Sequence, residues 1–460
     1  MADYYPYADK YPVNRRMPEQ GRAREEVLSE LQEIAGQEDG FWQTGQCSGT
    51  MYCGDMDHYA FMSQVSGLYA HVNILQRDIC PSATRFEGEI IAMTLDMLHG
   101  DPTAGACGST TSGGSESILS AVLAYREWGL AKKGIQKPEM ILPETAHVAF
   151  RKAAHLFGLE VHLAPVDPVT TQVDLNFVRD HINANTVLLV GSACNYGYGT
   201  IDAIDELSAL AVDHDIGLHV DACLGGFILP WGEALGYDIA VFDFRLPGVT
   251  TISADTHKYG YGPKGSSVLA FRSKELRQGL YFMQQEWSGG KYFSPGIAGS
   301  RPGGVLAATW ASMVSLGREG YLRYAREIFT TAFAMQDLVR SHPELKIVGK
   351  PSFCFSFFSE VFDIYLLNDF MRDRGWRFNG QQHPNALHMC VTRPQTQAGI
   401  TEKLGTDLAE AVTYAVEHKD EEARTGAVYG GMPKGVPAIT NAIQEVMTGM
   451  LDAQQDVPPE

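Results

Sequence analysis

The sequence predicts an α/β protein with a mostly parallel central sheet and a smaller C-terminal α/β domain. Between residues 84 and 271, short apolar runs alternate with segments of helical periodicity. Strands separated by helices in this way favour a parallel sheet that is covered on both faces. Beyond "GSRPGG" the pattern changes to long helices and two further strand-like runs. With 460 residues, 45% of them hydrophobic, the chain can bury a large core divided into subdomains.

An N-terminal arm and a first helix precede the central sheet. Val27, Leu28, Leu31 and Ile34 lie at helical spacing after an aromatic, proline-punctuated start. We expect this part to contact a partner subunit; a flexible tail is the alternative. The predicted parts are the arm and helix (1–60), a large cofactor-binding domain (61–305), a small C-terminal domain (306–450) and an unstructured tail (451–460).

Six apolar runs predict the strands of the large domain. They are "EMILP", "LEVHLAP", "TVLLVGS", "IGLHVDA", "VTTISAD" and "SSVLAF". In the small domain, "FCFSFFS" and "ALHMCVT" predict two strands, and a last amphipathic helix is expected near residues 397–418.

Charge and cysteine content exclude several functional classes. The net charge is −19, from 36 basic and 55 acidic residues, so the average field repels nucleic acid and anionic lipid surfaces. An anionic ligand therefore needs a local basic site. No apolar run reaches the length of a membrane span and the polar start lacks a signal-peptide core, which predicts a cytoplasmic protein without an integral membrane segment. The eight dispersed cysteines contain no CxxC pair and predict neither a disulfide framework nor a metal site.

The segment "CGSTTSGGSESIL" reads as a loop that feeds the start of a helix. Ser, Thr and two glycines, Gly113 and Gly114, come just before an apolar helical pattern. Free N–H groups and the helix dipole at such a start favour a phosphate. An ordinary capped helix is the alternative. Because no lysine follows the glycines and no GxGxxG is present, a nucleotide site is poorly supported.

Two further segments each end a predicted strand with a candidate functional residue. "IGLHVDACLGGF" places Asp221 where open α/β sheets bind ligands, although an aspartate there can also cap the next helix. "VTTISAD" leads into Lys258, and a lysine among aromatic and small residues can have a lowered pKa and act as a nucleophile. A solvated surface lysine is the alternative.

Together these three segments predict a pyridoxal 5′-phosphate site. The cofactor's phosphate seeks a helix N-terminus, its aldehyde needs an amine, and its pyridine nitrogen needs a carboxylate that keeps it protonated. The loop Gly113–Ser115, Lys258 and Asp221 supply these groups in turn.

The chain resembles the sphingosine-1-phosphate lyases, pyridoxal-phosphate enzymes related to the amino-acid decarboxylases. The resemblance covers most of the chain and rests on "SGTMYCGD", "NILQRDICPS", "TSGGSESIL", "PETAHVAFRKAAHLFG", "HVDACLGGF", "SADTHKYGYGPKGSSVL", "GSRPGG" and "NALHMCVT". It implies a soluble member of the bacterial type with an aspartate-aminotransferase-like fold (fold type I). It also implies a homodimer with shared active sites, and cleavage of a phosphorylated long-chain base to a fatty aldehyde and phosphoethanolamine.

The resemblance also implies roles for single residues around the cofactor. Lys258 would bind the cofactor aldehyde and Asp221 would pair with the pyridine nitrogen. His147 and Cys223 would pack on the two faces of the ring; core packing is the alternative for both. The groups implied to hold the cofactor phosphate are Gly114, Ser115, His257 and, from the neighbouring subunit, Ser300.

Tyr196 in "SACNYGYG" matches a tyrosine that the family places near the scissile bond. Together with Lys258 it is a candidate for proton transfer, and the sequence does not rank the two. Cys194 and Gly197 stand where the family is expected to carry prolines, so the shape of this loop is open.

A second lysine, Lys264, lies in the turn "GYGPKG" six residues after Lys258. The resemblance implies that Lys264 and Tyr52 bind the substrate phosphate; a surface turn lysine is the alternative. Gln76 stands where the family carries a histidine that contacts this phosphate, and an amide can donate a hydrogen bond but adds no charge.

Two other functions remain open at this stage. An amino-acid decarboxylase on the same scaffold would share Lys258, Asp221 and His147, but it would require a carboxylate-binding group and would have no use for Lys264. A non-catalytic protein that has kept the fold is the third hypothesis, and the intact lysine and aspartate argue against it.

Overall fold

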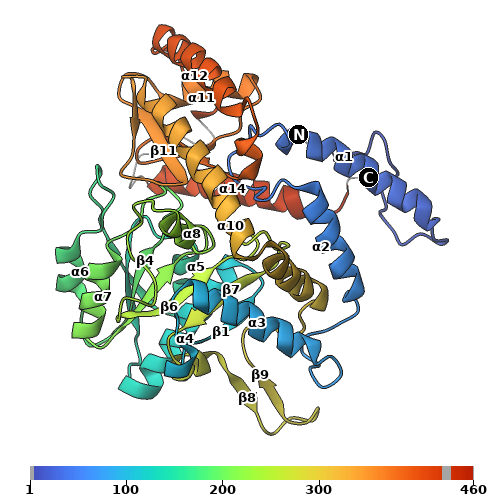
Figure 1. Ribbon diagram of the computed structural model, residues 1–460, viewed down its shortest axis with the longest axis vertical. Coiled ribbons are helices and arrows are strands. Elements are labelled where there is room, and N and C mark those ends of the chain that lie inside the picture. The colour runs from blue at the N-terminus through green and yellow to red at the C-terminus, as the bar shows by residue number, and fades with distance from the viewer. Residues whose placement is uncertain (1–4, 427–436, 459–460) are drawn as a thin grey trace.

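The large domain is built on a seven-stranded sheet (Figure 1). The computed structural model describes residues 5–426 and 437–458. The sheet has the order β1-β7-β6-β5-β4-β2-β3, and all neighbours are parallel except at β7, which is antiparallel to both β6 and β1. Its strands are β1 (Cys107–Thr111), β2 (Glu139–Pro143), β3 (Glu160–Ala164), β4 (Thr186–Ser192), β5 (Gly217–Asp221), β6 (Val249–Ala254) and β7 (Ser267–Phe271).

All six predicted strands of the large domain are confirmed, and β1 is added to them. The sequence predicts β1 only as part of a loop before a helix, since its small polar residues lack the apolar character of a strand. Because β7 reverses direction between β6 and β1, those two strands run the same way as the rest. The carboxyl ends of β1, β2, β4, β5 and β6 therefore meet at one edge of the sheet.

Helices cover both faces of this sheet, and each face has its own hydrophobic cluster. Along β7, Val268 and Ala270 belong to one cluster while Leu269 and Phe271 belong to the other, as the alternation of side chains along a strand requires. α4 (Gly114–Lys133) and α5 (Ala149–Phe157) pack in the second cluster; α3 (Ser82–Met97), α7 (Ile204–Asp213), α8 (Leu229–Ala234) and α10 (Gly303–Arg340) pack in the first. The helices of the large domain are α3 (Ser82–Met97), α4 (Gly114–Lys133), α5 (Ala149–Phe157), α6 (Leu175–His181), α7 (Ile204–Asp213), α8 (Leu229–Ala234) and α9 (Lys274–Arg277).

The long helix α10 (Gly303–Arg340) joins the large domain to the small one. The predicted boundary at residues 305 and 306 lies inside this helix, so the domains share an element rather than a loop. α10 is interrupted at Gly317, whose backbone angles (φ 57°, ψ 179°) are accessible only to glycine. This glycine allows one segment to pack on the large domain and then change direction.

The small domain carries a four-stranded antiparallel sheet in the order β10-β11-β13-β12. Both predicted strands are present, as β11 and β13. Its elements are β10 (Leu345–Ile347), β11 (Cys354–Ser359), α11 (Ile364–Asp373), β12 (Asn379–Gln381), β13 (Ala386–Cys390), α12 (Ile400–Glu417) and α14 (Pro437–Gln455).

The C-terminal end differs from its prediction in two respects. The amphipathic helix expected near residues 397–418 is present as α12, but α14 follows it and is the last helix. α14 runs to Gln455, so the first part of the segment predicted to be an unstructured tail is helical. Residues 1–4 of the predicted arm, 427–436 of the predicted small domain and 459–460 of the predicted tail lie outside the described residues.

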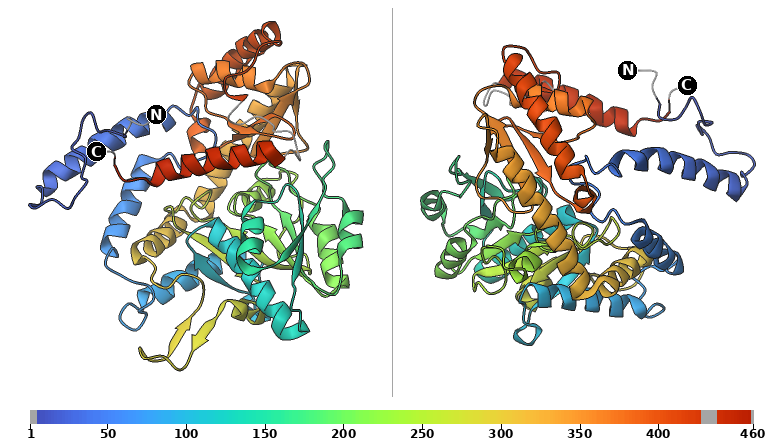
Figure 2. Two further views of the ribbon diagram at one scale, coloured as in Figure 1. Left: turned by 180° about the vertical axis from the view of Figure 1, so that it is seen from behind. Right: turned by 45° about the horizontal axis from the view of Figure 1, so that its top comes forward.

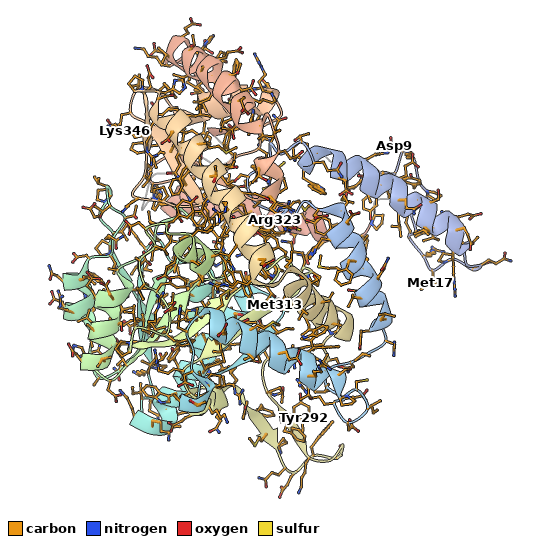
Figure 3. All side chains as sticks on the ribbon, in the orientation of Figure 1. Asp9, Met17, Tyr292, Met313, Arg323 and Lys346 are labelled. Carbon is orange, nitrogen blue, oxygen red and sulfur yellow. The ribbon has the colours of Figure 1, made fainter. Side chains whose placement is uncertain are left out.

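Two segments project from the body of the molecule. α1 (Arg24–Trp42) leads through a linker to α2 (Met56–Leu68) and extends away from both domains (Figures 1 and 2). The hairpin of β8 (Phe282–Gln284) and β9 (Tyr292–Ser294) projects at the bottom of the view in Figure 1. Figure 3 shows Met17 and Tyr292 at these two extremities. None of the helices in the described ranges combines the length and the apolar character that a bilayer crossing requires.

Candidate active site

The predicted site residues gather at the carboxyl edge of the central sheet. Gly114 follows β1, His147 follows β2, Tyr196 follows β4, Asp221 ends β5 and Lys258 follows β6. These residues are up to about 144 positions apart in the chain. They meet because parallel strands present their carboxyl ends at a common edge.

A cavity of about 320 Å³ lies at this edge, between the large domain, the small domain and the segment before α2. Seven predicted site residues line it: Tyr52, His147, Tyr196, Asp221, Cys223, Lys258 and Lys264. The other lining residues are Gly49, Thr50, Ser192, Cys194, Leu224, Arg377, Asn379 and Cys390.

Lys258 forms an ion pair with Asp255, a residue that the sequence analysis did not single out. The Lys258 Nζ lies 3.0 Å from Asp255 Oδ2, and the Asp255 carboxylate is buried. Burial would by itself lower the pKa of Lys258, but the charge of Asp255 outweighs burial and raises this pKa above its usual value. The expected lowering of the lysine pKa is therefore wrong, because the neighbouring carboxylate stabilises the ammonium form.

The orientation of Asp221 is held by neighbours on its own and the adjacent strand. Its Oδ1 accepts hydrogen bonds from the Cys223 N–H (3.0 Å) and the Ser253 hydroxyl (3.3 Å). His219 donates to or accepts from the same Ser253 Oγ at 3.2 Å, and burial lowers the pKa of His219 to about 4. His219 is therefore neutral at physiological pH and leaves the Asp221 charge uncompensated from that side.

His147 and Cys223 both line the cavity but in different surroundings. His147 is exposed, and its Nδ1 accepts a hydrogen bond from the Ala149 N–H at the start of α5 (3.1 Å). An accepting Nδ1 places the proton of the neutral ring on Nε2. Cys223 is buried, and burial raises the pKa of its thiol well above the usual value. The thiol is thus uncharged packing material and no nucleophile.

The loop that carries Tyr196 is closed by its own polar side chains despite Cys194 and Gly197 in place of the expected prolines. The Asn195 Oδ1 accepts from the Tyr198 N–H (2.9 Å), and its Nδ2 donates to the Thr200 hydroxyl (2.7 Å). Burial raises the pKa of Tyr196, so its phenol keeps its proton at neutral pH. Tyr196 is therefore suited to donate or relay a proton at the cavity.

The start of α4 is a cradle with no room for a side chain. A Cβ on Gly114 would lie 2.8 Å from Asp255 Oδ2 and 2.8 Å from Cys223 Sγ, and Gly113 has a φ of 151°. The N-cap has no side-chain hydrogen bond, so the helix start can bind an anion. His257 borders Gly113, and burial lowers the pKa of its ring.

The site fits pyridoxal 5′-phosphate in its three required parts. The α4 start with Gly114 and Ser115 can receive the phosphate, Lys258 can bind the aldehyde, and the oriented carboxylate of Asp221 can face the ring nitrogen. Gly114, Ser115 and His257 do not line the cavity itself. Gly114 lies against Asp255 and the cavity residue Cys223, and the His257 Nε2 lies 3.6 Å from Asp255 Oδ2.

Lys264 and Tyr52 lie together at another wall of the cavity. The Lys264 Nζ is 4.7 Å from the centre of the Tyr52 ring and donates a hydrogen bond to the Thr50 carbonyl (3.3 Å). Tyr52 is in turn packed edge-on against Tyr259, with ring centres 5.0 Å apart. Burial of its ammonium group and the nearby charge of Lys258 lower the pKa of Lys264.

Two predicted residues, Gln76 and Ser300, do not line this cavity. Both are exposed and occupy adjacent loops that Asn73 joins. The Asn73 side chain donates to the Ser300 hydroxyl (2.9 Å), and the Asn73 backbone carbonyl accepts from the Gln76 N–H (3.1 Å). Within one chain, therefore, these two residues belong to a separate surface.

Sequence reasoning missed Asp255, Arg377 and Asn379. A signal existed for Asp255, since it stands three residues before Lys258 in "SADTHK". Nothing in the local sequence points to Arg377 and Asn379, which lie more than a hundred residues away and enter the cavity from the small domain.

Comparison with known proteins shows relatives along most of the chain. The family model described as the pyridoxal-dependent decarboxylase conserved domain matches residues 6–359. The chain is 41% identical to the sphingosine-1-phosphate lyase of Arabidopsis thaliana, over 93% of this chain and 79% of that protein. It is 38% identical to the sphingosine-1-phosphate lyase of Saccharomyces cerevisiae, over 96% of this chain and 76% of that protein.

Solved structures agree with these relatives. A sphingosine-1-phosphate lyase of Burkholderia pseudomallei superimposes with a TM-score of 0.92 and is 57% identical, covering 99% of this chain and 100% of that one. Glutamate decarboxylase of Lactobacillus brevis shares the fold at a TM-score of 0.75 and 18% identity, over 90% of this chain and 97% of that one. The predicted α/β fold of type I, with its mostly parallel sheet, is confirmed.

Proposed function

The chain belongs to the sphingosine-1-phosphate lyases, within the family of pyridoxal-dependent decarboxylases, and from this we infer its reaction. It is a pyridoxal-phosphate-dependent carbon–carbon lyase. It cleaves a phosphorylated long-chain base of the sphingosine 1-phosphate type to a fatty aldehyde and phosphoethanolamine. The bond between the amine-bearing carbon and the adjacent hydroxyl-bearing carbon breaks in a retro-aldol reaction.

The observation that carries this reading is the position of Lys258 and Lys264 in one cavity. Lys258 is paired with a buried carboxylate, whereas Lys264 contacts a carbonyl and an aromatic ring. One lysine suffices for binding the cofactor. The second, without a carboxylate partner among the described residues, is suited to a phosphate on the substrate.

We propose a division of roles among the cavity residues. Bound pyridoxal phosphate supplies a ring that accepts the electrons left on carbon when the bond breaks. Lys258 anchors it, Asp221 holds the proton on its ring nitrogen, and His147 and Cys223 contact its two faces. The Lys258 amine and the Tyr196 phenol are the groups that can take a proton from the substrate hydroxyl and return one to carbon.

Replacing Lys264 tests its role at the phosphate. Lys264→Met removes a charge-assisted hydrogen bond of roughly 1.5–3 kcal/mol, so kcat/KM for sphingosine 1-phosphate should fall by about ten- to more than a hundredfold. The visible cofactor band should persist. Lys152→Met, on the exposed side of α5, is the matched control. An unaltered preference for the phosphorylated over the unphosphorylated base would contradict the role.

Product analysis distinguishes the lyase from the alternative decarboxylase. Sphingosine 1-phosphate and a panel of amino acids are incubated with the holoenzyme, and products are identified by mass spectrometry. A fatty aldehyde with phosphoethanolamine supports the lyase. Carbon dioxide with an amine supports a decarboxylase. The chain would then share with the lyases only its membership of the pyridoxal-dependent decarboxylase family.

We further propose that two chains form a homodimer with shared active sites. Ser300 and Gln76 lie together on a surface outside their own cavity, held by Asn73. Large apolar side chains are exposed on α1 and on the β8–β9 hairpin: Leu28, Leu31, Phe41, Phe282, Met283, Trp287 and Phe293. A second copy that covers these side chains would bring Ser300 to the neighbouring cofactor phosphate and Gln76 to the substrate phosphate.

A complementation experiment tests the shared site. Lys258→Ala chains and Ser300→Trp chains should each be nearly inactive alone, because each lacks one part of every site. Co-expressed, they should form mixed dimers with one intact site and regain activity. If Ser300 served the site of its own chain, no activity would return.

The expected division into a large domain (61–305) and a small domain (306–450), and the cytoplasmic location, stay predictions.

A further inference from the structure

The cavity contains a further positively charged residue, Arg377, to which neither the sequence prediction nor the proposed roles assign a function. It lies just before β12, in the small domain, and its side chain lines the same cavity as Lys258 and Lys264. Its guanidinium has no ion pair or hydrogen bond within residues 5–426 and 437–458. Arginines nearby behave differently: Arg374 pairs with Glu410, and Arg393 pairs with Glu327.

The backbone of Arg377 is fixed at the cavity by the segment that precedes α2. The Arg377 N–H donates to the Gln46 carbonyl (3.0 Å), and the Arg377 carbonyl accepts from the Ser48 N–H (2.9 Å). Asn379, two residues later, donates from its side chain to the Ser48 hydroxyl (3.3 Å). Arg377 is therefore held in place on both sides of its Cα although its side chain is free.

The same segment also holds Lys264. The Thr50 carbonyl accepts the Lys264 hydrogen bond, two residues beyond the attachment of Arg377 at Ser48. Two residues span at most about 7 Å, which is within the reach of an arginine and a lysine side chain. Gly49 (φ 60°) and Thr50 (φ 69°) are both left-handed, so the segment turns here. A threonine rarely adopts this conformation, and such residues are typical of ligand-binding turns.

The charges in the cavity leave these two cations uncompensated. The Lys258 ammonium is matched by Asp255, and the other carboxylate of the lining, Asp221, accepts from Cys223 and Ser253 at the end of β5. Lys264 and Arg377 then remain as two positive charges against the single negative charge of Asp221, in a chain whose net charge is −19. A substrate phosphate carries up to two negative charges, which this pair would balance.

We propose that Arg377 and Lys264 together bind the phosphate of the substrate and set the preference for phosphorylated long-chain bases. The guanidinium presents two parallel N–H donors to phosphate oxygens, while the ammonium contributes a point charge. Arg377 thereby supplies the charge that the neutral Gln76 cannot. The proposal deepens the proposed function and rests on it for the identity of the substrate.

The test replaces the charge and measures binding and turnover separately. Arg377→Gln should raise KM for sphingosine 1-phosphate by about tenfold or more while kcat changes little, because the contact is already made in the ground state. The unphosphorylated base should show no such change. Arg377→Lys should restore part of the loss. Arg372→Gln, an exposed arginine at the end of α11 outside the cavity, is the matched control.

A calorimetric titration is independent of turnover. The holoenzyme is titrated with phosphoethanolamine and, as the unphosphorylated counterpart, with ethanolamine. Arg377→Gln should weaken binding of the first about tenfold or more and leave the second unchanged, and the double variant with Lys264→Met should bind both alike.

The outcomes separate the two ideas. If the wild type produces no aldehyde, the proposed function fails, and phosphoethanolamine binding still decides whether Arg377 binds phosphate. If the wild type is an active lyase but Arg377→Gln keeps both the phosphate preference and the phosphoethanolamine affinity, Arg377 has no role at the phosphate. Loss of affinity for amino-acid carboxylates alone would assign the arginine to a carboxylate and overturn the proposal.

Discussion

Lys258 and Lys264 are six residues apart in the chain but face opposite electrostatic surroundings. The nearest charge to the Lys258 ammonium is the buried carboxylate of Asp255, which raises the pKa of Lys258. The same lysine acts on Lys264 as a positive neighbour and contributes to lowering the pKa of Lys264. Identical side chains thus acquire different chemistry: one amine is held by a carboxylate, and the other, which has no carboxylate partner among the described residues, is available for an anion.

Only Lys258 is expected to bind the cofactor covalently. Lys258→Ala should abolish both the visible absorption band of the holoenzyme and turnover, because the other lysine that lines the cavity, Lys264, contacts Thr50 and Tyr52 at another wall. Absorption spectra of the purified variant with added cofactor provide the measurement. A yellow, fully active variant would show that another lysine holds the cofactor; Lys264→Met, with its band intact, is the control.

Asp221 is expected to act through its charge rather than through packing. Asp221→Asn keeps the size of the side chain and a carbonyl that can accept from Cys223, but it cannot stabilise a proton on the ring nitrogen. We expect kcat to fall by about a hundredfold or more, with cofactor still bound. Steady-state kinetics at saturating cofactor provide the measurement. Unchanged turnover would contradict the prediction and would mean that the cofactor ring does not lie against Asp221.

At the scale of elements, we expect cofactor binding to depend on the start of α4. Strand β1 delivers the chain to a glycine pair at the carboxyl edge of the sheet, and α4 leads away from it for 20 residues. The close approach of Asp255 and Cys223 to Gly114 means that the helix start, the β5 end and the β6 end are in direct contact. A shift of one therefore displaces the others.

Gly114→Ala tests this cradle. The added methyl group would lie 2.8 Å from Asp255 Oδ2 and from Cys223 Sγ, so the helix start must move. We expect the affinity for pyridoxal phosphate to fall about tenfold or more, measured by titrating the apoprotein and following the visible band. Gly88→Ala in α3, where nothing lies within 4 Å, is the control. Equal affinities in both variants would place the phosphate away from α4.

At the scale of the whole molecule, buried titratable groups predict how stability depends on pH. Burial lowers the pKa of His219 and of His388 to about 4 each, and it raises the pKa of Asp202 to about 7. Both ring nitrogens of His388 lack a hydrogen-bond partner among the described residues. These groups differ in protonation between the folded and the unfolded chain.

We expect stability to fall as the pH drops from about 6.5 to 4. In this window the unfolded chain gains protons on both histidines, which the folded chain does not bind. Asp202 acts in the opposite sense, because its folded form keeps a proton that the unfolded form loses. The unfolded chain therefore binds one proton more than the folded chain, so the free energy of unfolding falls by about 1.4 kcal/mol for each pH unit of acidification.

Urea unfolding at pH 5 and pH 6.5 measures this slope. His388→Phe, which removes one buried titrating ring without creating an unpaired polar atom, should nearly abolish the dependence. His155→Gln, an exposed histidine on α5, should leave it unchanged. Equal stability of the wild type at the two pH values would mean that the buried histidines accept protons at no cost.

Much of the fold and of the cofactor site could be predicted from the sequence because their signals are local. Apolar runs of strand length identified six strands of the large domain and two of the small one. Asp221 ends one such strand and Lys258 comes four residues after another, so both lie at the carboxyl edge that parallel strands share. The family relatives bear out the cofactor that these residues predicted and the reaction that the resemblance implied.

Contacts between segments distant in the chain were decided only by the tertiary structure. Arg377 enters the cavity through hydrogen bonds to Gln46 and Ser48, more than 300 residues away, and no local pattern encodes such a pairing. The pKa of Lys258 is raised, contrary to expectation, because a pKa depends on the distance to one carboxylate and not on the kind of residues nearby. Sequence periodicity reports which faces are buried, whereas charge interactions depend on distances of a few ångströms that exist only after folding.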